Sequence, residues 1–259
     1  MNNFQTESQF KINLEKLMKE SYAQSDLYKP GNYWKFYEKN ILKQINNNKL
    51  SEFRSWKGGS GTGNIQSFGG GTEIKSRKFL RNFHPIDDEF DFIDDSIFTK
   101  KYNSLINKLI PFFSFSKFFL IRISELKQYY KDLYKSLIIE KYNSIIKEDK
   151  SLEKISDSEF GLNQKDLIYI NGKIYTLKLL QEMERLNYIK KNLEFEKINN
   201  IIEIGAGIGL LADAFFKLKR NIKYLIIDIP PTICFSEYYL KNLSYKVFGY
   251  EESSKRKEV

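Results

Sequence analysis

The chain has 259 residues and a mass of 30.7 kDa, with 41% hydrophobic and 15% aromatic residues and a mean hydropathy of −0.49. This length allows one large domain or two smaller ones with a true core, and the composition excludes disordered, collagen-like and integral membrane proteins. The formal net charge is +9, but Lys outnumbers Arg 35 to 7. Because surfaces that read phosphates typically recruit Arg, composition does not favour a nucleic-acid partner.

The cysteine content and the N-terminal segment indicate the compartment. Cys234 is the only cysteine in the sequence, so no intramolecular disulfide can form, which is typical of a reducing compartment. The N-terminal segment, MNNFQTESQFKINLEK, lacks the apolar stretch of a signal peptide. The most apolar segment, LIPFFSFSKFFLI (109–121), contains Pro111 and Lys117 and is too short to cross a bilayer. We therefore expect a cytoplasmic protein without a membrane span.

The region 1–150 is expected to be mainly helical. Apolar residues recur there at the spacing of amphipathic helices. The three predicted helical segments are 8–20, 32–48 and 116–147.

A glycine-rich loop, 56–71, separates the second and third helical segments and holds seven of the 14 glycines. Glycine tolerates positive φ and lets a ligand approach the backbone, so this loop is either a flexible connector or a lid that contacts a ligand. It is not a P-loop, because Lys75 and Ser76 come too late after the last glycine.

Six carboxylates lie between residues 87 and 95. They lack the spacing and glycine of an EF-hand, so we predict a solvated turn with Asp94 or Asp95 as a helix N-cap, and no metal site. The alternative is that these acids hold Mg²⁺ or Ca²⁺ or supply a catalytic base. The only histidine, His84, is a weak candidate for a catalytic base because its unperturbed pKa lies near neutrality. The alternative for His84, beside Pro85, is a structural role.

The pattern changes after residue 150. Two short β-prone runs flank Asn171-Gly172, which predicts a hairpin, and residues 176–192 fit a helix. From residue 199 onward, strand and helix patterns alternate, which favours an α/β fold with a parallel sheet. The expected strands are 200–205, 222–228 and 245–250, and the expected helices lie near 208–219 and 232–243.

The most informative segment is IIEIGAGIGLLADAFFKLKRNIKYLIIDIP (201–230), in which a strand runs directly into a glycine turn and a helix. Gly205, Ala206, Gly207 and Gly209 form this turn, which brings backbone N–H groups close to a ligand at the helix N-terminus. Asp228 stands at the end of the next expected strand. A carboxylate in that position can accept hydrogen bonds from both hydroxyls of a ribose.

The glycine spacing separates two classes of nucleotide-binding protein. In the dinucleotide fingerprint the third glycine comes three positions after the second, whereas here Gly209 comes two positions after Gly207. Glu203 stands two positions before Gly205. The pattern E-x-G-x-G-x-G followed by a strand-end acid resembles the first motif of class I S-adenosylmethionine (SAM)-dependent methyltransferases. NAD binding, or a turn needed only for packing, is the alternative.

The resemblance extends beyond this motif. The segment 201–243 is similar to the sugar O-methyltransferase family, in which a proline-bearing turn and a Tyr-Tyr-Leu helix follow the strand-end acid. Further matches are SDSEFGLN (156–163), NYWKFYEKNI (32–41) and the loop 56–71. The resemblance implies methyl transfer from SAM to a sugar hydroxyl, in surface-polysaccharide or glycan biosynthesis. It implies a cofactor site with the glycine turn along the methionine moiety, Asp228 at the ribose and Glu203 ordering the turn. The cofactor-binding residues that it implies are Glu203, Gly205, Ala206, Gly207, Gly209 and Asp228.

The expected sheet is incomplete. A class I methyltransferase sheet has seven strands, but the stretch from Asn199 to Val259 contains only the three expected ones. We therefore expect a helical N-terminal region (1–150), a connector (151–198) and the first half of a Rossmann-like SAM-binding domain (199–259). Such a sheet has an open edge and an uncovered apolar face, which calls for self-association or a complementing chain.

Two hypotheses compete with an active sugar O-methyltransferase. The first is a non-catalytic fragment that binds a partner chain or a glycan. The second is a nucleic-acid methyltransferase that uses the net charge of +9, and the scattered distribution of the basic residues argues against it.

Overall fold

The computed structural model describes residues 4–23, 32–56, 132, 135–164, 167–249 and 252. The N-terminal part contains α1 (Glu7–Ala23), α2 (Asn32–Asn47) and the 3-10 helix η2 (Leu50–Ser55). A helix over 135–148 leads to the short 3-10 helix η5 (Lys150–Lys154). These helices confirm the predictions for 8–20 and 32–48 and the end of the predicted helix 116–147. The loop beyond Trp56, His84, the acidic run 87–95 and the apolar segment 109–121 lie outside the described residues.

The predicted hairpin and the helix after it are confirmed. Strand β1 (Ile168–Ile170) pairs antiparallel with β2 (Lys173–Tyr175). Asn171 and Gly172 have φ angles of 51° and 74°, and positive φ at both positions is what a two-residue type I′ turn requires. Helix α6 (Leu177–Asn192) begins after Thr176, whose hydroxyl accepts the N–H of Leu179 as an N-cap.

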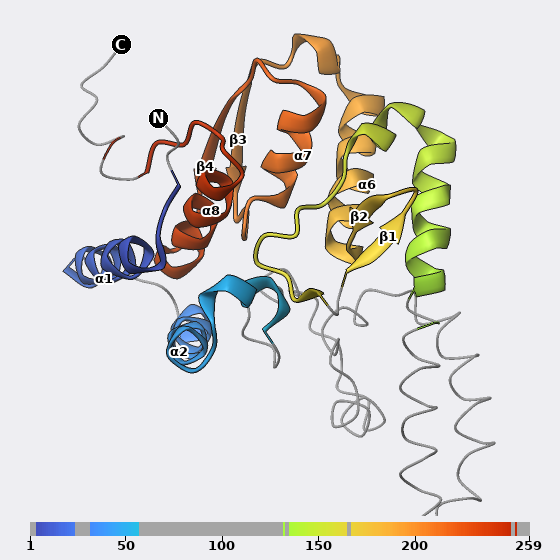
Figure 1. Ribbon diagram of the computed structural model, residues 1–259. Helices are drawn as coiled ribbons and strands as arrows, with labels where there is room; N and C mark the ends of the chain where they lie inside the picture. Colours follow the sequence, from blue (N-terminus) through green and yellow to red (C-terminus); the bar gives the residue numbers. More distant parts are fainter. Residues whose placement is uncertain are drawn as a thin grey trace, which may run out of the picture.

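The C-terminal part is a parallel β–α–β unit with a further helix, so the chain combines helices with small sheets (Figure 1). Strand β3 (Asn200–Ile204) pairs in parallel with β4 (Lys223–Ile227), and α7 (Leu210–Leu218) connects them. Helix α8 (Pro230–Asn242) follows β4, and the 3-10 turn η7 (Phe195–Lys197) precedes β3.

The predicted third strand, 245–250, is wrong for the residues that the structure describes, because 245–249 form no strand. The backbone N–H of Tyr245 donates to Leu240 O at 3.2 Å, and its hydroxyl donates to Asp213 Oδ1 at 2.7 Å. These bonds hold the start of the segment against α7 and α8. Strand propensity in 245–249 is thus overridden by tertiary contacts.

Two hydrophobic clusters pack against the parallel unit. One joins the helix 135–148, the hairpin and α6 to one side of α7. The other joins α1, α2 and η2 to α8, with the Phe10 and Phe235 ring centroids 4.8 Å apart. Figure 1 shows the same arrangement, with α1 beside α8 and α6 beside α7. Among the described residues, no helix is both long and apolar enough to span a membrane.

A buried ion pair links the N-terminal part to the connector. Arg54 Nη2 lies 2.8 Å from Asp157 Oδ2, and the two side chains are 4% and 0% exposed. Thr176 donates its hydroxyl proton to the same Asp157 oxygen at 2.5 Å, and Arg54 Nη1 donates to Ser158 O at 3.0 Å. The guanidinium also lies 5.1 Å from the ring centroid of Tyr239 on α8. This pair therefore connects η2, the segment 156–163, the start of α6 and α8.

We expect Asp157→Asn to lower the free energy of unfolding by about 3–5 kcal/mol, because it leaves the buried Arg54 charge without its partner. Urea unfolding followed by circular dichroism measures this change. The control is Glu194→Gln, which breaks the exposed Lys197–Glu194 pair and should have little effect. Equal unfolding midpoints for Asp157→Asn and wild type would contradict the role of the pair.

Candidate functional site

The glycine turn follows β3 directly. Gly205, Gly207 and Gly209 have φ angles of 76°, 62° and 85°, a region that residues with a Cβ rarely enter. The N–H of Gly205 donates to Ile227 O at 2.8 Å, which keeps the turn in register with the end of β4. Gly209 occupies the N-cap position of α7. The backbone therefore requires glycine at these positions before any ligand is considered.

Two of these glycines differ in their surroundings. A Cβ on Gly209 would lie 3.2 Å from Leu240 Cδ1, so this glycine permits close packing of α7 against α8. Gly205 is exposed, and no atom of the described residues lies within 4 Å of the place that its Cβ would take. Gly205 therefore presents its backbone to open space, as a ligand-contacting glycine would.

Asp228 lies against this turn. Its Oδ2 accepts the N–H of Gly207 at 2.9 Å, and its Oδ1 accepts the N–H of Ile229 at 2.8 Å. Burial raises the pKa of Asp228 to about 6, while the two backbone hydrogen bonds act in the opposite direction. Each carboxylate oxygen has two acceptor positions, so both can still accept a ligand hydroxyl.

Helix α8 supports the other side of the turn. The Ser236 hydroxyl donates to Gly207 O at 2.5 Å. Thr232 lies one helical turn earlier and is fully buried, and within the described part of the chain its hydroxyl has no hydrogen-bond partner. A buried hydroxyl without a partner costs free energy, but Thr232 is 0% exposed, so a ligand at the turn cannot reach it in this conformation.

Glu203 on β3 lies near Arg185 on α6 and near Asp228. Its Oε2 accepts the hydroxyl of Tyr224 at 2.8 Å, and burial raises its pKa. The hydrogen bond that orders the glycine turn comes instead from Asp228. The structure thus brings Asp228 together with Gly205, Ala206, Gly207 and Gly209, and Glu203 lies close enough to Asp228 for the two carboxylates to interact electrostatically.

A second buried carboxylate, which sequence analysis missed, lies near Glu203. Glu182 on α6 is 1% exposed, and both of its oxygens accept from Arg185 Nη1 at 3.0 Å. Burial raises the pKa of Glu182 to about 7, with Arg185 opposing the shift and Glu203 adding to it. The available signal was its spacing, since Glu182 lies three positions after Leu179 and four before Leu186 on the apolar stripe of α6.

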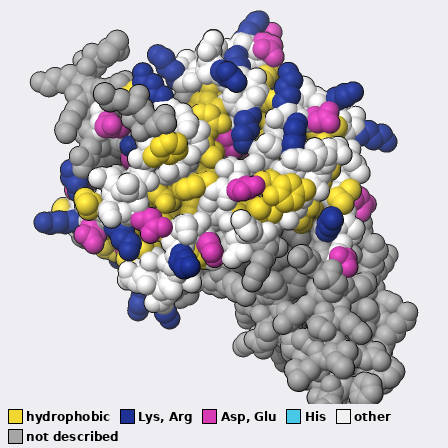
Figure 2. All heavy atoms as spheres, in the orientation of Figure 1, with side chains coloured by type: hydrophobic (Ala, Val, Ile, Leu, Met, Phe, Trp, Pro, Cys, Tyr) yellow, Lys and Arg dark blue, Asp and Glu magenta, His cyan; other side chains and the backbone are white. Residues whose placement is uncertain are grey.

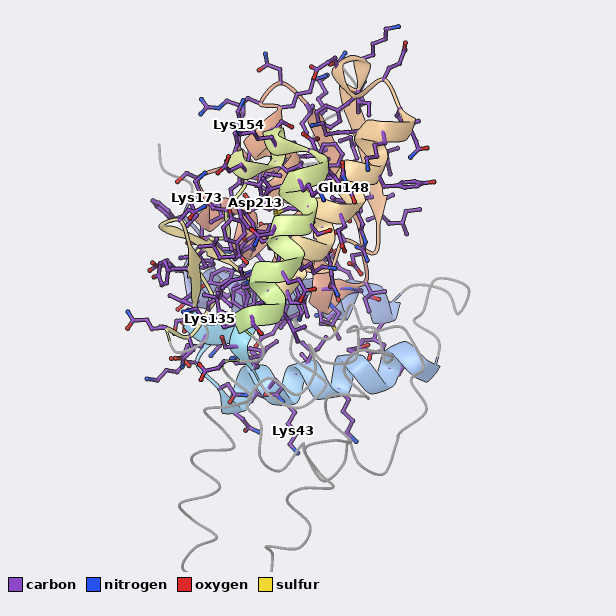
Figure 3. The ribbon with its side chains drawn as sticks, turned by 90° about the vertical axis from the view of Figure 1, so that its right-hand side faces the viewer. Lys43, Lys135, Glu148, Lys154, Lys173 and Asp213 are labelled. Carbon is purple, nitrogen blue, oxygen red and sulfur yellow. The ribbon has the colours of Figure 1, made fainter. Side chains whose placement is uncertain are left out.

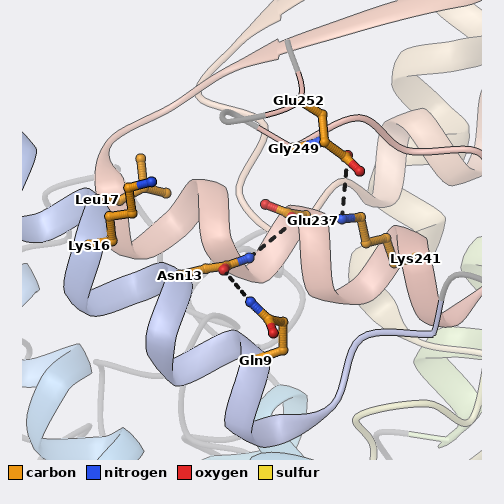
Figure 4. A pocket seen from close by; sticks show the side chains of 8 residues that line it. All are labelled: Gln9, Asn13, Lys16, Leu17, Glu237, Lys241, Gly249 and Glu252. Atoms are coloured by element: carbon orange, nitrogen blue, oxygen red, sulfur yellow. Dashed lines mark hydrogen bonds and ion pairs between the residues drawn. The ribbon is translucent and has the colours of Figure 1, made fainter. Parts of the chain in front are cut away.

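The structure also contains a polar cavity away from the glycine turn. It has a volume of about 260 Å³ and lies between α1, α8 and the C-terminal segment (Figure 4). Asn13 donates to Glu237 Oε1 at 3.5 Å, and Lys241 pairs with Glu237 at 2.7 Å. The lining residues are Gln9, Asn13, Lys16, Leu17, Glu237, Lys241, Gly249 and Glu252. Because its polar groups largely satisfy one another, this cavity is a weaker candidate site than the glycine turn.

Charged side chains form no metal centre in the part of the chain that the structure describes. No group of three or more potential ligands among its His, Cys, Asp and Glu residues could hold a metal ion. On the face shown in Figure 2, Lys and Arg side chains are spread around the surface rather than gathered together. Figure 3 shows Lys43 pointing away from the body, whereas Asp213, which is fully buried, lies among packed side chains.

Comparisons with known proteins assign no family. No family model matches the chain, and no solved structure matches it. An uncharacterized protein of Methanocaldococcus jannaschii is 33% identical over 61 residues, which are 24% of this chain and 16% of that protein. The match thus covers only a small part of that relative, whose description states no activity.

We expect Glu182→Gln to stabilise the protein at pH 8 by about 3 kcal/mol and to have little effect near pH 4.5. The folded-state pKa, about 7, exceeds the ordinary value of 4.5. As pH rises through this window the unfolded state loses its proton first, so wild-type stability falls while that of the variant does not. Urea unfolding at several pH values measures the difference.

The control is Glu184→Gln on the same helix, at a half-exposed carboxylate paired with Lys141. A stability difference between Glu182→Gln and wild type that stays constant from pH 4.5 to pH 8 would show that burial does not raise the Glu182 pKa.

Proposed function

We propose that this chain binds SAM at the glycine turn and Asp228 and that it serves as a methyltransferase. The observation that carries the proposal is the hydrogen bond from Gly207 N–H to Asp228 Oδ2. It joins the turn after β3 and the acid after β4 in one place, at the carboxyl ends of two parallel strands. Ligands of open α/β sheets bind at this edge.

The residues present fit this cofactor. Gly205 has open space beside its backbone, and the positive dipole end of α7 begins at Gly209. Asp228 has acceptor positions left for the two hydroxyls of a ribose. When bound, SAM supplies an activated methyl group.

For catalysis, the protein has to orient an acceptor hydroxyl and remove its proton, because a neutral alcohol is a poor nucleophile. Asp228 and the glycine turn would hold the cofactor and leave this proton transfer to another group. His84, the candidate base from the sequence, lies outside the described residues. Asp228 and the glycine turn are thus the proposed cofactor-binding residues, and the base that removes the hydroxyl proton is not assigned.

The acceptor that we propose is a sugar hydroxyl, in glycan or surface-polysaccharide biosynthesis in the cytoplasm. This part of the proposal rests on the resemblance of 201–243 and 156–163 to sugar O-methyltransferases. Asp157, in the second of these segments, pairs with Arg54 in the buried network.

A second candidate function is that of a non-catalytic chain that binds a complementing chain or a glycan. The observation that favours it is the size of the parallel sheet, which has two strands within the described residues. Open strand edges of this kind pair readily with another chain. A partner at the edge is thus part of both candidate functions.

We expect S-adenosylhomocysteine to bind the full chain, and Asp228→Asn to weaken binding by about 10- to 100-fold, because hydrogen bonds to a charged acceptor are lost. Isothermal titration calorimetry measures this change. Asparagine keeps one oxygen acceptor for the Gly207 N–H but loses the acceptor of the Ile229 N–H, so a circular dichroism spectrum like that of the wild type is required before the affinities are compared. Glu194→Gln, which removes an exposed carboxylate distant in sequence, is the control. Unchanged affinity in Asp228→Asn would exclude Asp228 as a ligand.

We also expect the affinity for S-adenosylhomocysteine to fall as pH decreases through about 6, the folded-state pKa of Asp228. The carboxylate accepts two ribose hydroxyls, whereas the protonated acid is a poorer acceptor. Titrations between pH 5 and pH 8 measure this dependence, which Asp228→Asn should abolish. An affinity that is constant over this range in the wild type would contradict the proposed contact.

A further inference from the structure

One face of the β3–β4 sheet is exposed and apolar. Ile202 and Ile204 on β3 are 66% and 81% exposed, and Leu225 and Ile227 on β4 are 53% and 48% exposed. The alternate residues of both strands, including Ile201 and Ile226, pack into the two hydrophobic clusters. The helices therefore cover one face of the sheet, and these four aliphatic side chains occupy the other, which we call the open face.

Such a face is unusual for a parallel sheet, because parallel strands almost always have both faces covered. The four side chains expose on the order of 500 Å² of apolar surface, within the range of patches that mark interaction sites. Both outer edges of the β3–β4 pair also lack a neighbouring strand in the described part of the chain.

We propose that a second copy of this chain covers the open face, with the two sheets stacked face to face about a twofold axis. The inference does not depend on the cofactor. It does have a consequence for the proposed function, since Ile204 and Ile227 directly precede Gly205 and Asp228. The second copy would therefore lie next to the proposed cofactor site.

The residue pattern of the open face is self-complementary. Its outward positions pair across the strands as Asn200 with Lys223, Ile202 with Leu225, and Ile204 with Ile227. The face thus has one polar row at its amino end, followed by two apolar rows.

The twofold axis would lie between the two stacked sheets, perpendicular to the strands and midway between the two apolar rows. Around this axis, apolar residues of one copy face only apolar residues of the other. Ile202 then faces Ile204 of the second copy, and Leu225 faces its Ile227, in the reciprocal arrangement of an isologous interface. The two Lys223 side chains lie at opposite ends of the interface, exposed to solvent and far from each other. The aliphatic side chains can interdigitate as in other stacked sheets.

The area is consistent with a weak dimer. Two open faces bury about 1,000 Å² in total, which is close to the lower limit for a specific interface. We therefore expect a concentration-dependent dimer with a Kd that is roughly micromolar or weaker.

Sedimentation velocity on the full chain, between roughly 1 and 100 µM, tests the proposal. The wild type should shift from monomer to dimer over this range. The double substitution Ile202→Thr/Ile204→Thr should remain monomeric, with an unchanged circular dichroism spectrum, because both positions are exposed and threonine keeps strand propensity. Tyr188→Gln, which removes a side chain that is 70% exposed on α6, is the control and should still form the dimer.

Three results would overturn the proposal. A wild-type chain that stays monomeric at all concentrations would show that a second copy does not cover this face. A dimer that survives the double threonine substitution would indicate pairing through strand edges, because threonine leaves the edge N–H and C=O groups unchanged. Assemblies that grow beyond the dimer would exclude a closed twofold interface.

Discussion

The arrangement of the described elements depends on the ion pair between Arg54 and Asp157. These residues are distant in sequence, and their contact brings η2 to the segment that precedes the hairpin. Asp157 also accepts from Thr176, whose hydroxyl in turn caps α6, so one carboxylate connects tertiary packing to the start of a helix. Because α6 packs on α7, the position of the glycine turn at the start of α7 depends on the same network.

The glycine turn itself is stabilised by hydrogen bonds to two later parts of the chain, the end of β4 and helix α8. Asp228 accepts the N–H of Gly207, and the Ser236 hydroxyl on α8 donates to the carbonyl oxygen of Gly207. Asp228 would thus have two roles, as a structural acceptor within the turn and as the proposed ligand of a ribose. Burial keeps its pKa near 6, so a modest acidification affects both roles. Burial similarly raises the pKa values of Glu182 on α6 and Glu203 on β3.

Features set by local backbone geometry could be predicted from the sequence. The Asn171-Gly172 turn and the glycines after β3 need positive φ, which the residue types reveal. Contacts between distant residues could not be predicted, as the Arg54–Asp157 pair shows. The hydrogen bonds of Tyr245 with α7 and α8 likewise override the strand propensity of 245–249. An uncovered apolar face was expected because the sequence predicts few strands, and the exposed side chains of Ile202 and Ile204 confirm this face. Methyl transfer and the sugar acceptor stay predictions.

The most direct test of the central claim is a nuclear magnetic resonance titration of protein labelled with ¹⁵N only at its 14 glycines. On addition of S-adenosylhomocysteine, we expect the amide signals of Gly205, Gly207 and Gly209 to shift, because the ligand would lie against this turn. Gly161 and Gly172, which belong to other parts of the fold, should keep their positions. If saturating ligand left the signals of the turn unchanged, SAM binding at this site would be contradicted.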